Sequence, residues 1–506
     1  MLARVRSATL SGIEAATIFV EVDVTPGLPS FTTVGLPDST VRESRDRVRA
    51  AIRNAGFEFP IERITVNLAP ADLRKEGAAL DLPTAVGILC ATGLVKPGRL
   101  ERALVVGELS LDASVRPVRG VLPVALHARR EGFTPLLVPA TNAAEAGVVR
   151  GIDVIPIATL HDAVEYLNGE REIVPATGRL GIDRAGDGDG LDFSDVRGHA
   201  HAKRGLEIAA AGAHNVLMIG PPGTGKTMLA RRVASILPPL SVEEAIETST
   251  VWSVAGLLPP EQGLLTGRPF RSPHHTASEA GLIGGGGGVP HLGEISLAHH
   301  GVLFLDELPE FSPRALEALR QPIEDARVVV SRSAGTASFP ARFQLVAAAN
   351  PCRRGCPSLP TCACSPGERA RYLARLSRPL LDRIDLHLEI PSLPYAQLTG
   401  ATSGEPSAVI RTRVLAARAR QAVRFTGTAT HVNARMSGRQ TRRHCPLPAD
   451  AARLLGLALT RLGLSVRAHD RLLRVARTIA DLADSDPITA EHVSEAIQYR
   501  GLDRAR

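Results

Sequence analysis

A glycine-rich loop near the middle of the chain has the residues that hold nucleotide phosphates. It follows the apolar run "NVLMI" and precedes the helix-like run "MLARRVA". Glycines let the backbone N–H groups of such a loop curl around phosphate oxygens at a helix N-terminus. Lys226, one of four lysines in the chain, would reach the β- and γ-phosphates, and Thr227 would bind Mg²⁺. The sequence predicts an ATP and Mg²⁺ site made by Gly220, Pro221, Pro222, Gly223, Thr224, Gly225, Lys226 and Thr227.

Two further apolar runs end in side chains suited to phosphoryl transfer. "GVLFLDELPEF" is a strand-like run that ends in Asp306 and Glu307. Asp306 would hold the Mg²⁺ through water, and Glu307 would orient and polarise the attacking water. "FQLVAAAN" ends in Asn350, which would contact the γ-phosphate or that water. Phosphoryl transfer needs positioning and charge neutralisation, and these three side chains supply both.

Two arginines follow these elements along the chain. Arg383, in "LSRPLLDRIDL", is expected to be a finger presented to the ATP of a neighbouring subunit. Arg467, in "LSVRAHDRLLRVART", opens a helix-like run in the last part of the chain and would touch the γ-phosphate from a lid. A finger supplied by a neighbour implies that the active form is a ring or another oligomer.

Four of the six cysteines lie in the short stretch "NPCRRGCPSLPTCAC". Four thiolates fill a tetrahedral Zn²⁺ site, so structural zinc is the favoured interpretation, while redox-sensitive thiols and plain reduced cysteines stay open. The N-terminus reads as mature protein without an export signal, which predicts a cytoplasmic chain. In the reducing cytosol, clustered cysteines bind metal more often than they form disulfides. The predicted zinc ligands are Cys352, Cys356, Cys362 and Cys364.

The elements that must position these residues divide the chain into several parts. Residues 1–170 alternate strand-like and helix-like runs, which predicts a mixed α/β domain. Residues 171–195 form a Gly- and Asp-rich linker, and 196–393 again alternate as an α/β nucleotide domain. A second, flexible linker covers 394–406, and 407–506 is helical in pattern. No apolar stretch is long enough to span a membrane.

The charge of the chain suits a polyanionic partner. The net charge is +7, and from Pro406 to Ala449 there are nine arginines and no acidic residue. Either this stretch is a solvated helix face, or it contributes to binding a polyanion. Aromatic residues make up only 3% of the chain, which argues against a platform that stacks bases.

The sequence resembles the ComM/YifB family of magnesium-chelatase-like AAA+ ATPases over nearly its whole length. The phrases that carry the match include "VNLAPADLRKEGAALDLPTAVGIL", "MIGPPGTGKTMLA", "RPFRSPHHTAS", "GEISLAHHGVLFLDELPEF", "FPARFQLVAAANPC" and "SVRAHDRLLRVARTIADL". The resemblance implies an N-terminal domain similar to the Lon protease domain, a central AAA+ module and a C-terminal helical lid. It also implies a hexameric, ATP-driven DNA helicase that extends branch migration during natural transformation.

The first domain lacks the residues of a Lon-type peptidase. Such enzymes use a Ser–Lys dyad, and the matching phrase here, "KEGAALD", has Ala79 in the place of the serine. The lysine would fall in "VRGVLPVALHAR", which contains none. Covalent catalysis needs a nucleophile and a group that activates it, so we expect a domain without peptidase activity.

Two segments are expected to meet DNA. "RPFRSPHHTASEAGLIGGGGGVPHLGEISLAHHG" looks like the helix-2 insert of this AAA+ group, a loop that projects into a central pore. "RVVVSRSAGTASFPARF" predicts a hairpin with a turn at Ala334-Gly335, near which Arg332 would either grip a phosphate or be a solvated charge. Such contacts are indifferent to base sequence. For the histidine pairs His274-His275 and His299-His300 we favour loop polarity or DNA contact.

Two other functions compete with a DNA-translocating motor. One is the ATPase subunit of a magnesium chelatase, which loads metal into a porphyrin. The other is an AAA+ chaperone that remodels proteins, which the Lon-like domain suggests. Stimulation of ATP hydrolysis by DNA separates the motor from both alternatives.

Overall fold

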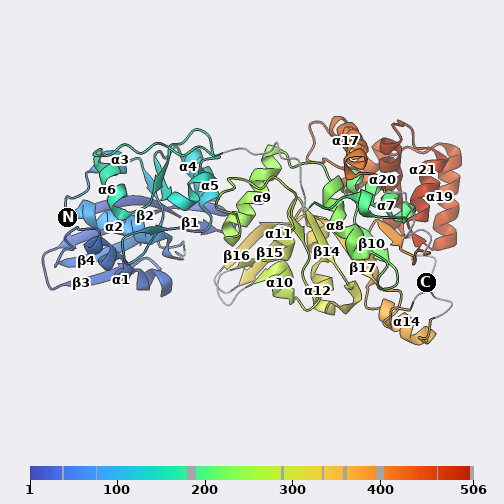
Figure 1. Ribbon diagram of the computed structural model, residues 1–506, viewed down its shortest axis with the longest axis horizontal. Coiled ribbons are helices and arrows are strands. Elements are labelled where there is room, and N and C mark those ends of the chain that lie inside the picture. Colours follow the sequence, from blue (N-terminus) through green and yellow to red (C-terminus); the bar gives the residue numbers. More distant parts are fainter. Residues whose placement is uncertain are drawn as a thin grey trace. The chain divides into compact units, whose positions relative to one another are not determined.

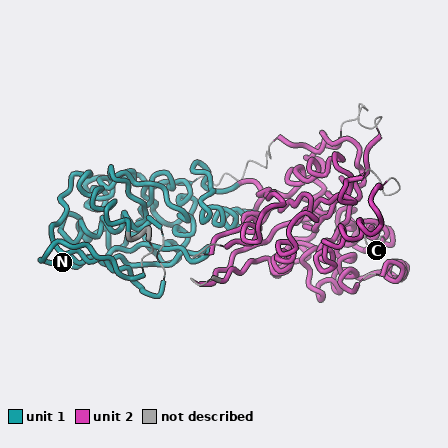
Figure 2. The backbone as a smooth tube through the Cα atoms, turned by 90° about the horizontal axis from the view of Figure 1, so that it is seen from below, with its two compact units in different colours: residues 1–183, 241–265 teal, residues 184–240, 266–506 magenta. Residues whose placement is uncertain are grey.

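The chain forms two compact units. The computed structural model describes residues 1–36, 39–73, 75, 77–178, 190–285, 290–332, 335–356, 362–394, 404–463 and 465–501. One unit contains residues 1–183 and 241–265, and the other contains 184–240 and 266–506 (Figures 1 and 2). Residues 241–265 lie inside the predicted nucleotide domain 196–393 but pack with the first unit. The chain therefore passes between the units three times, at 183–184, 240–241 and 265–266.

The first unit is built on a seven-stranded mixed sheet in the order β3-β4-β2-β1-β5-β8-β9. Its strands are β1 (Leu2–Ser11), β2 (Glu14–Thr25), β3 (Ser30–Val34), β4 (Arg63–Ala69), β5 (Leu104–Val105), β8 (Leu136–Pro139) and β9 (Val154–Ile157). Every second residue from Ile18 to Val24 on β2 is buried, as expected for a strand with one face on a core. This confirms the mixed α/β pattern of the N-terminal region.

The helices of the first unit include one, α9, that comes from a later part of the chain. They are α1 (Ser39–Asn54), α2 (Asp81–Ala91), α3 (Pro97–Leu100), α4 (Val121–Glu131), α5 (Ala143–Ala146), α6 (Leu160–Asn168) and α9 (Val242–Ala255). A capping box of Ser241 and Glu244 starts α9. The Gly120 N–H donates to the Ser253 carbonyl at 3.0 Å, and the Ser253 hydroxyl bonds the Glu145 carboxylate. These contacts fix α9 within the first unit.

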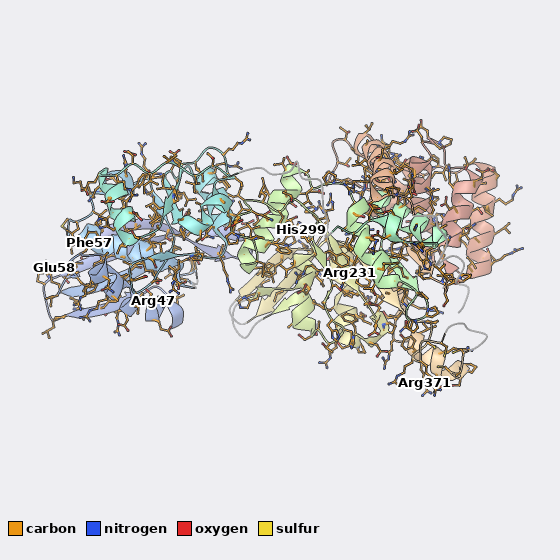
Figure 3. All side chains as sticks on the ribbon, viewed as in Figure 1. Arg47, Phe57, Glu58, Arg231, His299 and Arg371 are labelled. Atoms are coloured by element: carbon orange, nitrogen blue, oxygen red, sulfur yellow. The ribbon has the colours of Figure 1, made fainter. Side chains whose placement is uncertain are left out.

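A buried ion pair lies beside the position where a Lon-type peptidase has its nucleophile. Arg47 on α1 (Figure 3) grips the buried Asp81 with Nε–Oδ2 and Nη2–Oδ1 distances of 2.8 and 3.2 Å. Burial raises the pKa of Asp81 despite this partner. Ala79, two residues earlier, lies in a short 3₁₀ helix (Ala78–Leu80) and offers no nucleophile. The following α4 contains no lysine.

The second unit has a five-stranded parallel sheet in the order β11-β14-β17-β10-β18. Its strands are β10 (Val216–Ile219), β11 (Phe270–Arg271), β14 (Val302–Leu305), β17 (Gln344–Ala349) and β18 (Leu386–Glu389). β14 and β17 are buried along their whole length, which is typical of central strands of a parallel sheet. Helices α7 (Ala200–Gly212) and α8 (Lys226–Ile236) share a core with these strands. The alternating α/β pattern predicted for this part of the chain is confirmed.

Shorter elements surround this sheet. The helices are α10 (Glu279–Ile283), α11 (Glu294–Leu297), α12 (Pro313–Ala318), α13 (Arg320–Asp325), α14 (Pro366–Leu373) and α15 (Arg378–Leu381). Two antiparallel hairpins pair β12 (Gly284–Gly285) with β13 (His291–Leu292), and β15 (Arg327–Arg332) with β16 (Gly335–Pro340). Among the helices that the structure describes, none combines the length and apolar character needed to cross a membrane.

The last hundred residues are helical, as predicted. The helices are α17 (Ser407–Arg424), α18 (Gly438–His444), α19 (Ala449–Leu462), α20 (Val466–Leu482) and α21 (Ala490–Gln498). The arginine-rich stretch that suggested a polyanion partner has a different use here. Six of its nine arginines bond to other groups of the same chain: Arg411, Arg413, Arg418, Arg420, Arg424 and Arg435. Most of this stretch therefore packs the helices, and only α18 presents exposed arginines: Arg439, Arg442 and Arg443.

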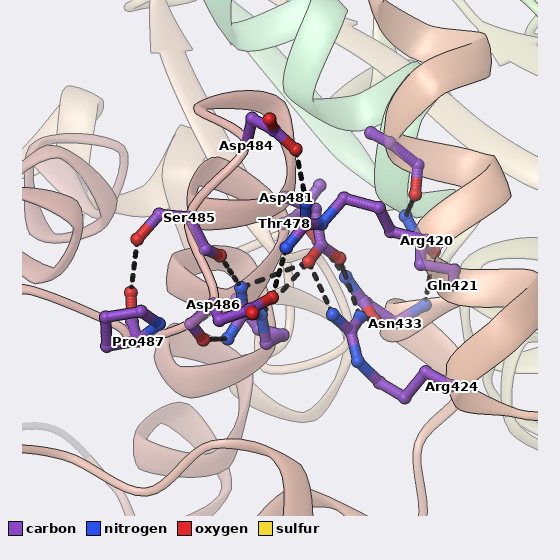
Figure 4. A network of polar contacts seen from close by, with 12 residues as sticks. Arg420, Gln421, Arg424, Asn433, Thr478, Asp481, Asp484, Ser485, Asp486 and Pro487 are labelled. Atoms are coloured by element: carbon purple, nitrogen blue, oxygen red, sulfur yellow. Dashed lines mark hydrogen bonds and ion pairs between the residues drawn. The ribbon is translucent and has the colours of Figure 1, made fainter.

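A buried carboxylate joins the C-terminal helices (Figure 4). The Asp481 side chain on α20 has no exposed surface. It accepts hydrogen bonds from Arg424 of α17 at 2.7 Å, from Asn433 at 2.8 Å and from Arg477 at 3.1 Å. Because a buried charge must be paired, this one side chain ties α17, the loop before α18 and α20 together.

We expect Asp481→Ala to destabilise the second unit by about 3–5 kcal/mol, because it leaves two arginines buried without their partner. Arg420→Ala is the matched control. Arg420 also bridges α17 to acidic residues, Asp484 and Asp486, but both of these side chains are about nine-tenths exposed, so its loss should cost about 0–1 kcal/mol. The urea midpoint, followed by circular dichroism, measures both changes. Equal shifts in the two variants would contradict this ranking.

Candidate nucleotide site

The predicted phosphate-binding loop lies between β10 and α8. Gly223 and Gly225 have φ values of +78° and +86°, a left-handed conformation that glycine adopts without strain. Gly225 caps the N-terminus of α8. A Cβ atom on Gly220 would lie 2.1 Å from the carbonyl oxygen of Ile390, so this position admits no side chain. The loop therefore brings backbone N–H groups and the positive end of the α8 dipole to one place.

Lys226 is held inside this loop. Its ammonium donates to the carbonyl oxygens of Gly220 and Pro221 at 2.7 and 2.8 Å, and to Asn350 Oδ1 at 3.2 Å. Burial lowers the pKa of Lys226, while Asp306 and Glu307 oppose that shift. The charge is thus preorganised within the loop, as a phosphate-binding lysine requires.

Two strands deliver the other polar groups to the same edge of the sheet. Asp306 directly follows β14 and Asn350 directly follows β17, and both strands run parallel to the one that precedes the loop. Asp306 Oδ2 accepts a hydrogen bond from the Thr227 hydroxyl at 2.7 Å. A hydroxyl and a carboxylate in contact are suitable Mg²⁺ ligands. The structure therefore brings together the residues around the loop that the sequence singled out.

Glu307 has a partner that the sequence analysis did not identify. Its Oε2 lies 3.2 Å from Nδ1 of His275, and half of the Glu307 side chain is exposed. Glu307 has a φ of +50°, which is uncommon for a residue with a side chain. His275 lies in the segment that we had related to loop polarity or DNA contact. The ring of its neighbour His274 contacts it in a tilted arrangement, with 4.1 Å between ring centroids. The catalytic carboxylate candidate is therefore engaged by that segment.

The other histidine pair contacts the backbone of Arg342. The ring Nδ1 of His299 accepts a hydrogen bond from the backbone N–H of Arg342 at 3.0 Å. The backbone N–H of His300 donates to the Arg342 carbonyl at 2.7 Å. These bonds hold the chain just before β14. The contacts favour a role in supporting the sheet over the DNA contact that we had also considered.

The four clustered cysteines converge next to this site. The Sγ atoms of Cys352, Cys356, Cys362 and Cys364, called the cysteine cluster below, all lie within 4.8 Å of one another. The Cys356 N–H donates to Cys352 Sγ at 3.2 Å. Burial raises the pKa of the Cys364 thiol to about 11. A hydrogen bond from the backbone N–H of Cys364 helps to lower the pKa of the Cys362 thiol to about 7. Residues 357–361, between the second and third cysteines, are outside the described ranges.

The two arginines lie at the opposite edge of the sheet. Arg383 comes shortly before β18, whereas the loop comes directly after the parallel neighbour β10. Its side chain is buried, and its Nη2 lies 2.7 Å from Glu324 Oε1. Arg467 is exposed and lines a cavity of about 300 Å³ together with Glu324 and Asp385. Neither arginine is placed near the phosphate-binding loop of its own chain.

Asp385 organises the floor of that cavity. Its carboxylate accepts hydrogen bonds from Arg471 at 2.8 Å and from the Asn215 N–H at 3.1 Å. Burial works against ionisation, but Arg471 and His214 keep the pKa of Asp385 well below its usual range. The amino edge of the sheet therefore carries a fixed network of charges.

Both segments predicted to meet DNA contain hairpins. The long glycine-rich segment forms the β12–β13 hairpin, and its residues 286–289 are not among those described. In the second hairpin Arg332 pairs with Gly335, so the predicted turn begins one residue too late. Residues 333–334 and the Arg332 side chain lie outside the described part, and the predicted phosphate contact stays a prediction.

Three family models match consecutive parts of the chain. A model described as "Subunit ChlI of Mg-chelatase" matches residues 20–142, "Magnesium chelatase, subunit ChlI" matches 192–398, and "Magnesium chelatase, subunit ChlI C-terminal" matches 404–500. The middle match includes the whole phosphate-binding loop, Asp306, Asn350 and the cysteine cluster.

Full-length relatives agree with these matches. A YifB protein of Salmonella typhimurium is 47% identical over 504 residues, and the competence protein ComM of Haemophilus influenzae is 46% identical over 509 residues. A Mycobacterium tuberculosis protein is 44% identical over 500 residues. Each alignment covers 99% of this chain and 98% of the relative. The chain therefore belongs to the ComM/YifB family of magnesium-chelatase-like AAA+ proteins.

Proposed function

We propose that this protein hydrolyses ATP and uses the energy to translocate on DNA. The observation that carries the first half is the single sheet edge at which Lys226, the Thr227–Asp306 pair and Asn350 meet. When ATP and Mg²⁺ bind, the metal neutralises charge on the phosphates. Lys226 would bind the β- and γ-phosphates, Thr227 and Asp306 would hold Mg²⁺, and Glu307 would orient the attacking water.

The active form is proposed to be a ring, with six subunits as the family resemblance implies. Arg383 and Arg467 lie at the amino edge of the sheet, whereas the phosphate-binding loop lies at the carboxyl edge. An arginine there can complete an ATP site only by meeting the carboxyl edge of another subunit. Arg383 Nε is buried with no hydrogen-bond partner among the described residues, and Nη2 contacts Glu324, so acting on a neighbour requires this side chain to leave its present position. Head-to-tail contacts of this kind close into rings.

The proposed DNA contacts are electrostatic. The exposed arginines of α18 and the two hairpins of the second unit are the candidate surfaces. Binding through arginines to phosphates carries no base sequence information, which suits a motor that moves along any sequence. The Haemophilus relative is named a competence protein, so we propose branch migration during natural transformation or recombination as the setting. The Lon-like fold of residues 1–170, without peptidase activity, is part of this proposal.

A magnesium-chelatase subunit is the second candidate, because all three family models carry that name. A protein-remodelling chaperone is the third. Neither requires DNA, so both predict ATP hydrolysis that DNA leaves unchanged.

We expect single-stranded or forked DNA to stimulate ATP hydrolysis severalfold, and both Lys226→Ala and Glu307→Gln to abolish the stimulated rate. Loss of the lysine removes phosphate binding, and loss of the carboxylate removes the group that orients water. Phosphate release measured with and without DNA tests this. Glu307→Gln should still bind ATP, since its defect lies in hydrolysis. A rate that DNA does not change would favour a chelatase or chaperone partner.

We expect mixtures of two inactive variants to recover activity if Arg383 acts on a neighbour. Lys226→Ala subunits retain the arginine and Arg383→Ala subunits retain the loop, so a mixed ring contains interfaces with both. Mixing Lys226→Ala with Glu307→Gln is the matched control, because both defects lie on the same side of the interface and no subunit keeps both Lys226 and Glu307. Recovery in both mixtures, or in neither, would contradict action in trans.

We expect His275→Ala to raise the hydrolysis rate without DNA severalfold and to reduce the stimulation by DNA. The substitution frees Glu307 from the 3.2 Å contact, so the carboxylate can face the water before DNA binds. His274→Ala is the control, because His274 bonds Thr276 instead. A lower rate in His275→Ala would show that the contact positions Glu307 for hydrolysis and does not restrain it.

A further inference from the structure

The cysteine cluster has the geometry of a closed metal site. Tetrahedral Zn²⁺ with four thiolates has Zn–S bonds of about 2.3 Å, which places the sulfur atoms about 3.8 Å apart. The observed limit of 4.8 Å between all four Sγ atoms leaves only a small contraction to reach that arrangement. Three of the four cysteines are buried, and Cys362 is half-buried. Four sulfur donors with no open position are typical of a structural site.

We propose that the cysteine cluster binds one structural Zn²⁺, and that this metal fixes residues 352–356 against the phosphate-binding loop. Soft sulfur donors alone select zinc over Mg²⁺ or Ca²⁺. Zinc with four thiolates carries a net charge of −2. Arg353 and Arg354, between the first two ligands, lie on the surface where they offset it. The Cys356 N–H bond to Cys352 Sγ is of the kind that orients a thiolate ligand.

A direct contact joins this loop to the nucleotide site. Gly355 lies between two cluster residues and has a φ of +64°. A Cβ atom there would lie 2.8 Å from Cδ and Cγ of Pro222, so the bare glycine backbone rests on the proline ring. Pro222 belongs to the phosphate-binding loop. The position of the zinc loop therefore limits the positions that the phosphate-binding loop can take.

Both ends of the zinc loop are attached to the same site. At its start, Asn350 precedes Cys352 by two residues and accepts the hydrogen bond from Lys226. Beyond its end, α14 leads to Arg375, whose Nη1 donates to the Pro309 carbonyl at 3.1 Å, three residues after Asp306. Tyr372 on α14 is buried next to this region, and burial raises its pKa to about 12. A metal that closes the loop would hold these attachments at fixed separation.

The metal site is tested by the metal content of purified protein. Protein prepared without added zinc should contain close to one zinc per chain by mass spectrometry of the metal. Cys364→Ser should contain far less. Cobalt substituted for zinc should give the intense charge-transfer and d–d bands of a tetrahedral tetrathiolate, and these bands should be lost in the serine variant. Well under one equivalent in the wild type, with four reactive thiols or with disulfides, would overturn the metal site.

The coupling to the phosphate-binding loop is tested without removing a ligand. Gly355→Ala keeps all four cysteines but pushes a methyl group against Pro222. We expect it to retain zinc and to weaken binding of a fluorescent ATP analogue severalfold. Gly427→Ala is the matched control, because Gly427 has a similar φ of +75° and a Cβ atom there meets nothing within 4 Å; it should change neither quantity. Unchanged nucleotide affinity in Gly355→Ala would overturn the coupling.

The coupling rests on the proposed ATP site, whereas the metal site does not. Lys226→Ala separates the two, because it should lose nucleotide affinity and keep its zinc. Zinc bound in a protein that fails to hydrolyse ATP would contradict the proposed function and leave the metal site standing. DNA-stimulated hydrolysis in a protein that never contains zinc would contradict the metal site and leave the proposed function standing.

Discussion

The parallel arrangement of β10, β14 and β17 is the constraint on which the rest of the site depends. Parallel strands end at the same edge of a sheet, so a residue placed directly after each strand must meet the others. The hydrogen bonds from Lys226 to Asn350 and from Thr227 to Asp306 are the result. The same constraint separates Arg383 from the loop, because it precedes β18 at the amino edge, and α20 places Arg467 in the cavity at that edge. One sheet therefore has the phosphate-binding loop at one edge and the two arginines at the other.

Arginine supplies much of the packing in the second unit. Asp481 pairs with arginines from two elements, and Asp385 pairs with Arg471 at the amino edge of the sheet. Guanidinium groups suit such sites because they offer several donors in a fixed plane. Lysine is rare in this chain, and among the described residues the buried Lys226 does not form the ion pairs that the buried arginines form. Lys226 is a compact charge enclosed by carbonyl oxygens, placed for a ligand that the loop surrounds.

The nucleotide site also has supports from two segments outside the strand edge. His275 reaches Glu307 from the segment before α10, and Gly355 rests on Pro222 from the cysteine loop. The first contact concerns the carboxylate that would orient water, and the second concerns the loop that would hold phosphates. The carboxylate proposed for hydrolysis and the loop proposed for phosphate binding are thus each in contact with a segment outside the strand edge. A movement of either segment would alter the position of the group it contacts.

Much of this protein could be read from local sequence. The phosphate-binding loop, the strand ends at Asp306 and Asn350, the helical C-terminal region and the cysteine spacing are all short patterns, because each depends on neighbours within a few residues. The hairpin 327–340 was also predicted, with its turn displaced by one residue. The two α/β regions were recognised because strand and helix periodicities differ.

What the sequence left open depends on residues that are distant along the chain. His275 and Glu307 lie far apart along the chain but in contact in the fold, and no local sequence pattern pairs them. Residues 241–265 read as part of the nucleotide domain, yet hydrogen bonds of Ser253 to Gly120 and Glu145 place them in the first unit. From the sequence, the arginines of 406–449 could be interpreted only as a charged surface. In the fold, several of them bond to partners on α7, α8 and α20. The sequence by itself determined which chemistry is present, because that chemistry lies in short motifs. Only the tertiary structure decided which charges are satisfied and which edge each group faces, because burial and pairing are set by contacts across the fold.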